Sequence, residues 1–204
     1  LRLEEIADGE QSGTWGATTN TNLELIGEAL GFGTQAITTN ADTFTSTIAD
    51  GATDPVRAMF VKYTGTLDSA CTITIAPNTL NRMHFIENGT SGAQNIIISQ
   101  GSGANVTIPP GDTKAVYLDG AGSGAAVIDA FASLSVVDLK VQDDLTVTDD
   151  LIVNGDIDLE GSIDVNGTTN LDVVDVDGAV NFAADVTFAD GADIITASAG
   201  TSNF

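Results

Sequence analysis

Basic residues are scarce in this chain of 204 residues. Six Lys and Arg residues stand against 29 Asp and Glu residues, and no Lys or Arg follows Lys140. The formal net charge of −23 at pH 7 repels phosphate backbones and anionic lipid surfaces, which argues against nucleic-acid or membrane partners. No apolar run approaches the ~20 residues that span a bilayer, and no basic segment followed by an apolar one opens the chain. We therefore expect a soluble protein without membrane insertion.

Cysteine, histidine and tryptophan each occur once. A lone Cys71 excludes a disulfide within the chain, and its alternating run Ala-Cys-Thr-Ile-Thr-Ile predicts a small core residue. His84 lies between Met83 and Phe85 in a strand pattern, which predicts a structural rather than a catalytic histidine. Carboxylates are spread along the chain and single out no pair in a cleft. The sequence therefore predicts no enzyme, no catalytic residue and no cofactor.

The fold class predicted from composition is mainly β. Gly, Thr, Asn, Asp and Ser are abundant while Lys is scarce, as in chains of short strands and turns. Residues 1–35 differ from the rest, since apolar residues recur there at helical spacing between Asn22 and Leu30. The Asn residues before this run are suited to capping its start and Gly31 to ending it. We expect one short helix in this N-terminal segment, with Trp15 in a loop before it.

Residues 36–131 alternate apolar and polar positions, with turns about every ten residues. This spacing predicts a β-sandwich, jelly-roll-like, with its own core. The predicted strands are Thr43 to Ile48, Arg57 to Tyr63, Cys71 to Ala76, Met83 to Asn88, Asn95 to Ser99, Asn105 to Ile108, Lys114 to Leu118 and Ala126 to Ala130.

Residues 132–194 contain a repeat with a period of six. The units include Leu-Lys-Val-Gln-Asp-Asp at 139–144 and Leu-Thr-Val-Thr-Asp-Asp at 145–150, and the register breaks around 171–178 before returning. Two aliphatic residues spaced by two share one face of a short strand, and the Asp, Asn and Gly that follow favour a turn. A single unit buries too little apolar surface to be stable alone, so each unit must stack on neighbours.

The neighbours are predicted to be other copies of the chain. The repeats would make only about three coils of a single-chain β-helix, with open edges at both ends. Three chains wound about one axis would pair those edges and fill the axis with aliphatic residues, giving a homotrimeric β-helical shaft. An ordinary antiparallel sheet is the alternative. The predicted axis residues are Leu139, Val141, Leu145, Val147, Leu151, Val153, Ile157, Leu159, Ile163 and Val165.

The Asp-rich turns are candidates for calcium sites, because oxygen ligands at alternate positions suit that ion. The closest segment, Asp175 to Gly178, lacks an acidic residue two positions earlier and a Glu at the far end of the loop. A solvated anionic surface is the preferred interpretation, so no metal site is predicted. Residues 195–204 show no periodicity, and we expect a flexible end in a chain that continues in a longer protein.

Three stretches resemble proteins of one group. The run from Gly9 to Gly16, followed by Asn20-Thr-Asn22 and a short helix, resembles the opening of many tail-fibre and virion structural proteins of tailed bacteriophages, particularly marine and cyanobacterial ones. The run from Val106 to Gly120 is similar to a later segment of such proteins. The Leu-x-Val-x-Gly-Asp hexads resemble the trimeric β-shafts of phage fibres.

This resemblance implies a homotrimeric tail fibre on the virion that takes part in host adsorption. Its N-terminal region would attach to another tail protein, such as the tail tube, an adaptor or a nozzle, and a distal region beyond this chain would contact the host receptor. A carbohydrate-binding module of such an appendage, with exposed aromatics on one face, and a fragment of a bacterial trimeric adhesin are the alternatives. The candidate attachment or interface residues are Trp15, Gly16, Asn20, Asn22, Leu23 and Ile26.

Overall fold

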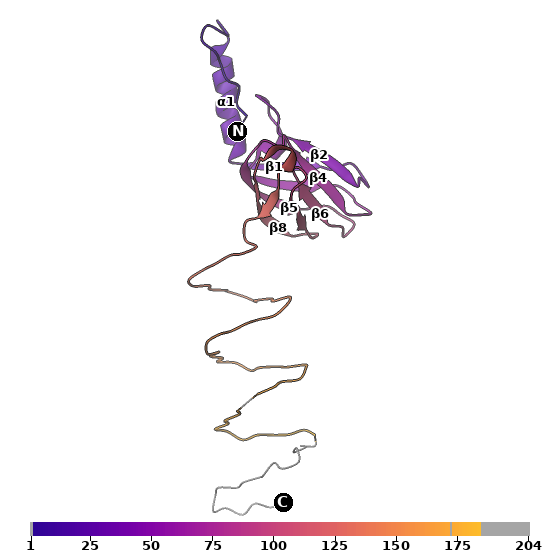
Figure 1. Cartoon of the computed structure of the whole chain (residues 1–204), viewed down its shortest axis with the longest axis vertical. Helices are drawn as coiled ribbons and strands as arrows, with labels where there is room; N and C mark the ends of the chain where they lie inside the picture. Colours follow the sequence, from indigo (N-terminus) through magenta and orange to yellow (C-terminus); the bar gives the residue numbers. More distant parts are fainter. Residues whose placement is uncertain (1, 172, 185–204) are drawn as a thin grey trace, which may run out of the picture. The chain divides into compact units, whose positions relative to one another are not determined.

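The chain divides into two units. A computed structural model describes residues 2–171 and 173–184 (Figure 1). The first unit ends at Lys140 and the second begins at Val141. Within the described residues the protein is mostly β, with one α-helix and two mixed sheets, neither of which closes on itself.

The helix α1 spans Trp15–Ala29 and is longer than predicted. It begins seven residues before Asn22, so the expectation that Trp15 lies in a preceding loop is wrong. The amides of Ala17 and Thr18 donate to the carbonyl of Thr14 at 2.9 and 3.2 Å, and this turn starts the helix without a side-chain cap. The other end is as expected, since the Gly31 amide donates to the Glu28 carbonyl at 3.0 Å.

In the part of the chain that the structure describes, nine strands follow the helix. All eight predicted strands are present with boundaries shifted by at most three residues, and a ninth, β1, was not predicted. Two short 3-10 helices, η1 at Pro55–Arg57 and η2 at Gly122–Gly124, lie in connections. The strands are β1 Phe32–Ala36, β2 Thr43–Thr47, β3 Phe60–Thr64, β4 Cys71–Ala76, β5 Arg82–Asn88, β6 Ile96–Ser99, β7 Val106–Ile108, β8 Thr113–Leu118 and β9 Val127–Asp129.

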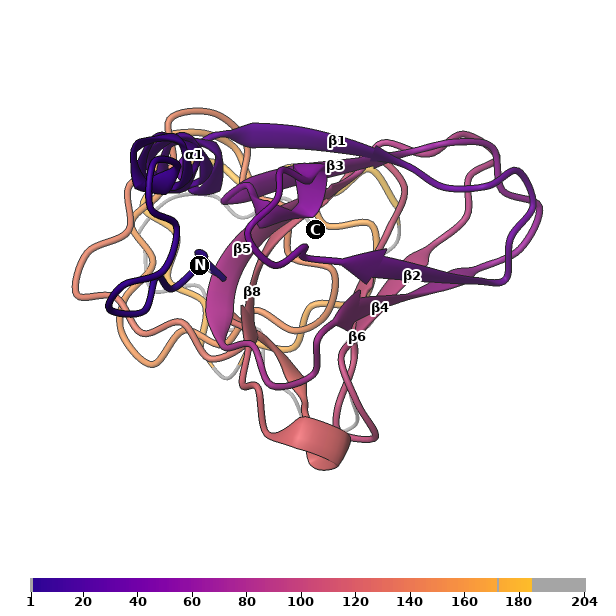
Figure 2. The same ribbon diagram turned by 90° about the horizontal axis from the view of Figure 1, so that it is seen from above.

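From β1 to β6, consecutive strands alternate between the two sheets. The five-stranded sheet has the order β1-β3-β5-β8-β9, and the four-stranded sheet has the order β2-β4-β6-β7 (Figure 2). β1 pairs in parallel with β3 and β3 with β5, while β2 pairs in parallel with β4 and β4 with β6. The chain therefore winds through three coils before β7, β8 and β9 add antiparallel pairs.

The predicted jelly-roll topology is wrong, because jelly rolls are built from antiparallel strands. The coarser expectation of two sheets around one core holds. Inward residues of both sheets form one cluster, with Val61 and Ile86 on one side and Ile73 and Ile98 on the other. The buried hydroxyl of Tyr63 reaches across this core to the Ser46 hydroxyl at 3.0 Å.

The second unit has no helix or strand among residues 141–171 and 173–184. Its aliphatic hexad residues are exposed in the single chain, and their exposure repeats with the hexad. The residues at the first position of each hexad (Leu145, Leu151, Ile157 and Ile163) are 62–70% exposed. Those at the third position (Val141, Val147, Val153, Leu159 and Val165) are 43–53% exposed. The trimeric shaft stays a prediction. The predicted hexad at 186–191 and the predicted flexible end at 195–204 lie outside the described residues.

Candidate interaction surface

The N-terminal segment is fastened to the helix by the side chain of Asn22. Its amide oxygen accepts from the Glu4 amide at 3.0 Å and its amide nitrogen donates to the Glu4 carbonyl at 2.9 Å. Asn22 was expected to cap the helix, but it lies inside α1 and satisfies the backbone of another segment instead. Gln11 adds a second link, since its side-chain nitrogen donates to the Glu4 carboxylate at 2.6 Å.

The predicted attachment residues are spread around α1. Trp15 at its start is 63% exposed, so it does not pack as a buried staple on the helix. Leu23 and Asn20 are also exposed, whereas Gly16 and Ile26 are half-buried. The helix buries Leu25 and Ala29 instead. An interface role for the exposed members of this set stays a prediction.

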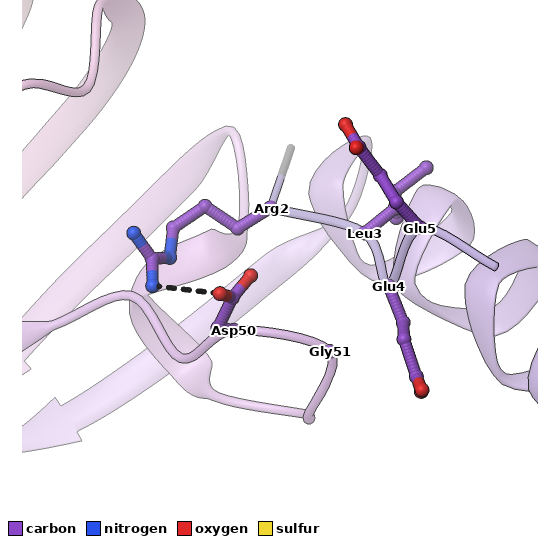
Figure 3. Close-up of a pocket in the computed structure, with 6 residues that line it drawn as sticks. All are labelled: Arg2, Leu3, Glu4, Glu5, Asp50 and Gly51. Carbon is purple, nitrogen blue, oxygen red and sulfur yellow. Dashed lines mark ion pairs between the residues drawn. The ribbon is translucent and has the colours of Figure 1, made fainter. Parts of the chain in front are cut away.

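A pocket of about 500 Å³ lies where the N-terminal segment meets the loop after β2 (Figure 3). Arg2 pairs with Asp50 at 3.4 Å, and the Gly51 amide donates to the Arg2 carbonyl at 3.0 Å. The side chains of Glu4 and Glu5 extend in different directions (Figure 3). These carboxylates therefore do not converge on one point, and the Arg2 contacts serve to hold the segment against the loop.

The outer surface of the five-stranded sheet carries a row of aromatic rings. Phe32 pairs in register with Phe60, and Phe60 with Phe85, so three rings follow one another across β1, β3 and β5. The rings of Phe32 and Phe60 stack with centroids 5.4 Å apart. A second row lies two residues from Phe85 along β5, where Met83 is in register with Tyr117, and Tyr117 with Ile128. We call this surface the aromatic face; its members are Phe32, Phe60, Met83, Phe85, Tyr117 and Ile128.

The outer surface of the four-stranded sheet has a different chemistry. Thr43 pairs in register with Thr72, and Thr45 with Thr74, while Thr107 pairs with Ile97 two strands along. Threonine favours strands and its hydroxyl forms hydrogen bonds with water, so this surface is well suited to contact with solvent. We call it the threonine face; its members are Thr43, Thr45, Thr47, Thr72, Thr74 and Thr107.

A groove of about 340 Å³ joins the aromatic face to the end of α1. Ile26, Ala29 and Leu30 of the helix line one side, and Met59 and Met83 line the other. Leu30, Met59 and Met83 are exposed. Leu80, Asn81 and Arg82 complete the lining, so the groove connects the sheet to the end of the helix through a largely apolar surface with two polar residues.

A buried cationic cluster lies beside this groove. Arg57 is wholly buried and donates to the carbonyls of Ala49 and Ala52 at 2.7 and 2.8 Å. Its guanidinium is balanced by Asp54 at 3.5 Å and Glu28 at 3.9 Å. The Asp54 carboxylate also accepts from the amides of Ala49 and Arg57. The cluster folds the connection between β2 and β3 and ties it to α1.

Arg82 extends the cluster, because it donates to the Arg57 carbonyl at 2.6 Å. Burial, and then the neighbouring Arg57 charge, lower the pKa of Arg82. The hydrogen bond and the partial burial of Arg82 indicate that its side chain orders the start of β5.

His84 and Cys71 both lie in the core. His84 is fully buried, and its Nδ1 lies 2.9 Å from the Ala58 carbonyl, so this nitrogen donates. Burial, and then the Arg82 charge, lower the pKa of His84 to about 3, which keeps the imidazole neutral. Burial raises the pKa of the Cys71 thiol. Cys71 occupies the core position that the sequence predicted, and His84, predicted only as a structural histidine, is buried as well.

Searches of the described residues found no group of three or more His, Cys, Asp or Glu residues arranged to hold a metal ion. Among those same residues, no helix has the length and apolar character needed to cross a membrane.

The aromatic face was missed by the sequence reasoning, although one signal was available. In Met83-His84-Phe85-Ile86 apolar residues occur at both alternating positions of the strand, Met83 and Phe85 at one and Ile86 at the other, a pattern typical of a strand with two apolar faces. The alignment of Phe32 with Phe60 had no such signal, because it depends on which strands pair.

Comparisons with known proteins give no relative. No protein-family model matches the chain, and searches of curated proteins and of solved structures found no match.

Proposed function

We propose that the chain is part of a homotrimeric tail fibre of a bacteriophage, a structural protein of the virion tail that takes part in host adsorption. The observation that carries this proposal is the exposed hexad repeat of the second unit. Its aliphatic side chains recur every six residues and alternate between two levels of exposure. Such a pattern leaves a continuous apolar strip on a regularly winding chain, which requires a partner of the same repeat.

Three copies would supply that partner. Burying two aliphatic side chains per hexad contributes about 3–5 kcal/mol per chain per layer before the entropy of ordering is subtracted. The Asp and Asn residues of the turns would then face water, where their charge keeps an elongated trimer soluble. The acidic composition thus suits a fibre whose apolar surface is confined to its axis.

The resemblance of the opening residues to phage virion proteins supports attachment through the N-terminal region. The proposed partners are the tail tube, an adaptor or a nozzle on the virion, and a host receptor bound by a distal region. Exposed Trp15 and Leu23 provide apolar contacts for such an attachment. The proposed fibre is non-enzymatic and needs no cofactor.

Mass in solution tests this proposal directly. Light scattering coupled to size-exclusion chromatography should give three times the chain mass of 20.8 kDa, independent of dilution into the micromolar range. Negative-stain electron microscopy of the same sample should show a rod that contains residues 139 onward. A stable monomer at micromolar concentration would refute the proposal.

The aromatic face favours a second candidate, a carbohydrate-binding module on the same appendage. Rows of aromatic rings on a sheet are a common platform for apolar faces of ligands. A glycan array probed with the full chain should then give binding that Phe85→Ala abolishes and Thr45→Ala, on the threonine face, leaves intact. Absence of binding to every glycan would remove this candidate.

A further inference from the structure

We infer that the aromatic face and the adjoining end of α1 form an interface between copies of this chain, so that the first unit takes part in the assembly alongside the hexads. This inference rests on the proposed trimer and names a second contact surface within it. The first unit has its own core, and nothing in the hexad argument requires it to touch another copy.

The difference between the two outer surfaces is the first observation. Both sheets belong to one unit and cover one core, yet the outward positions of one are mostly threonine, with Ile97 among them, while those of the other include Phe, Met, Tyr and Ile beside the Lys62–Glu87 pair. If both surfaces faced water, the same solubility requirement would act on each. A large apolar patch on one surface alone marks a contact site.

Charge is the second observation. The chain as a whole repels its own copies, since acidic residues exceed basic ones by 23. At the outward positions of the five-stranded sheet the acidic Glu87 is paired with Lys62 at 2.7 Å. Two copies can therefore approach through this surface with the local charge neutralised.

The composition of the surface separates a second copy from a sugar. Aromatic residues and methionine are enriched at the centres of protein interfaces, where charged residues are depleted. A sugar needs hydrogen-bonding side chains at the edge of the stacking rings. The cross-strand neighbours of the rings here are Met83, Ala115 and Ile128, and the nearby Lys62 and Glu87 bond to each other. Glu28 and Asp54 line a pocket with Phe32, but both are already paired with Arg57. The groove continues this surface onto Leu30, at the end of α1.

The two methionines of the chain are native reporters of this surface. Met59 is 40% exposed and Met83 is 49% exposed in the single chain, and both line the groove. Oxidation of methionine by dilute peroxide depends on access to the thioether. Thr107→Met places a matched methionine on the threonine face.

The experiment measures oxidation rates by mass spectrometry on full-length chain whose mass has been determined in the same sample. We expect a trimeric mass, with Met59 and Met83 oxidised about tenfold more slowly than the methionine introduced at position 107. Tyr117→Glu should remove this protection while the hexads keep the mass trimeric. Thr45→Glu, which adds the same charge to the threonine face, should leave the protection unchanged.

The outcomes separate the interface from the proposed function. A trimer in which Met59 and Met83 react as fast as the introduced methionine would overturn the interface and leave the fibre proposal standing. A monomeric mass would overturn both. Protection that arises only after bacterial lipopolysaccharide is added would assign the aromatic face to sugar and overturn the interface between copies.

Discussion

Acid should destabilise the first unit through His84. In the unfolded chain its imidazole has a pKa of about 6.5, whereas in the folded chain burial, and then the Arg82 charge, lower the pKa to about 3. Between these two values the unfolded chain binds a proton that the folded chain does not. The free energy of unfolding therefore has its full His84 contribution above pH 6.5 and falls as the pH drops toward 3.

The magnitude follows from the width of this window. At pH 4.5 the solution is two pH units below the unfolded pKa, and each unit corresponds to about 1.4 kcal/mol. His84 alone should thus remove about 3 kcal/mol from the free energy of unfolding relative to pH 7.5. This is a large share of the roughly 5–15 kcal/mol that stabilises a typical domain.

Urea denaturation of the full chain at pH 7.5 and pH 4.5, followed by far-UV circular dichroism, measures this loss. His84→Gln is the matched variant, because its amide can donate to the Ala58 carbonyl but does not titrate. Every carboxylate titrates in both proteins, so its effect cancels when the two losses are subtracted at one protein concentration. Wild type should lose about 3 kcal/mol more than the variant. Equal losses would refute a neutral, buried His84.

Two further substitutions, each with a matched control, test the hexads of the second unit and a tight contact between loops of the first unit. Val153→Asp should break the proposed trimer, because three carboxylates would meet at one level of the axis at a cost of about 3 kcal/mol or more per chain. The control Ile152→Asp, at the more exposed neighbouring position, should leave the trimer mass unchanged. Equal light-scattering masses for the two variants would contradict the axis assignment. Gly92→Ala should destabilise the first unit, since a Cβ there would lie 1.8 Å from the Leu67 carbonyl oxygen. Gly111→Ala has a similar positive φ but open space around it. The Gly92 variant should therefore unfold at lower urea, by about 1–3 kcal/mol, and equal midpoints would show that the close contact relaxes freely.

Strands were predictable where burial alternates along the chain. β4 is the clearest case, since its residues alternate between buried and half-buried and its predicted limits, Cys71 and Ala76, are the observed ones. β1 had no such signal. Its inward residue is Gly33, where a Cβ would lie 1.9 Å from the Pro55 carbonyl oxygen. Because only glycine fits there, the period of two is lost and the strand cannot be read from hydropathy.

The start of the helix was misjudged for a different reason. Asn residues favour N-caps when their side chains bond to nearby amides, and that local rule placed the start near Asn22. In the folded chain the Asn22 side chain bonds to Glu4, which is 18 residues away in sequence. A long-range contact therefore removed the signal on which the local prediction depended.

The amino-acid sequence was sufficient for the β content, the turns, the core position of Cys71 and the six-residue repeat, because these depend on residues a few positions apart. Which strands pair depends on contacts between segments about 25 residues apart, as between Phe60 and Phe85, and alternation carries no information about them. Only the folded chain aligned the aromatic rings on one face and the threonines on the other. Parallel pairing aligns Phe32, Phe60 and Phe85 in one row, whereas antiparallel pairing brings Met83, Tyr117 and Ile128 together beside them.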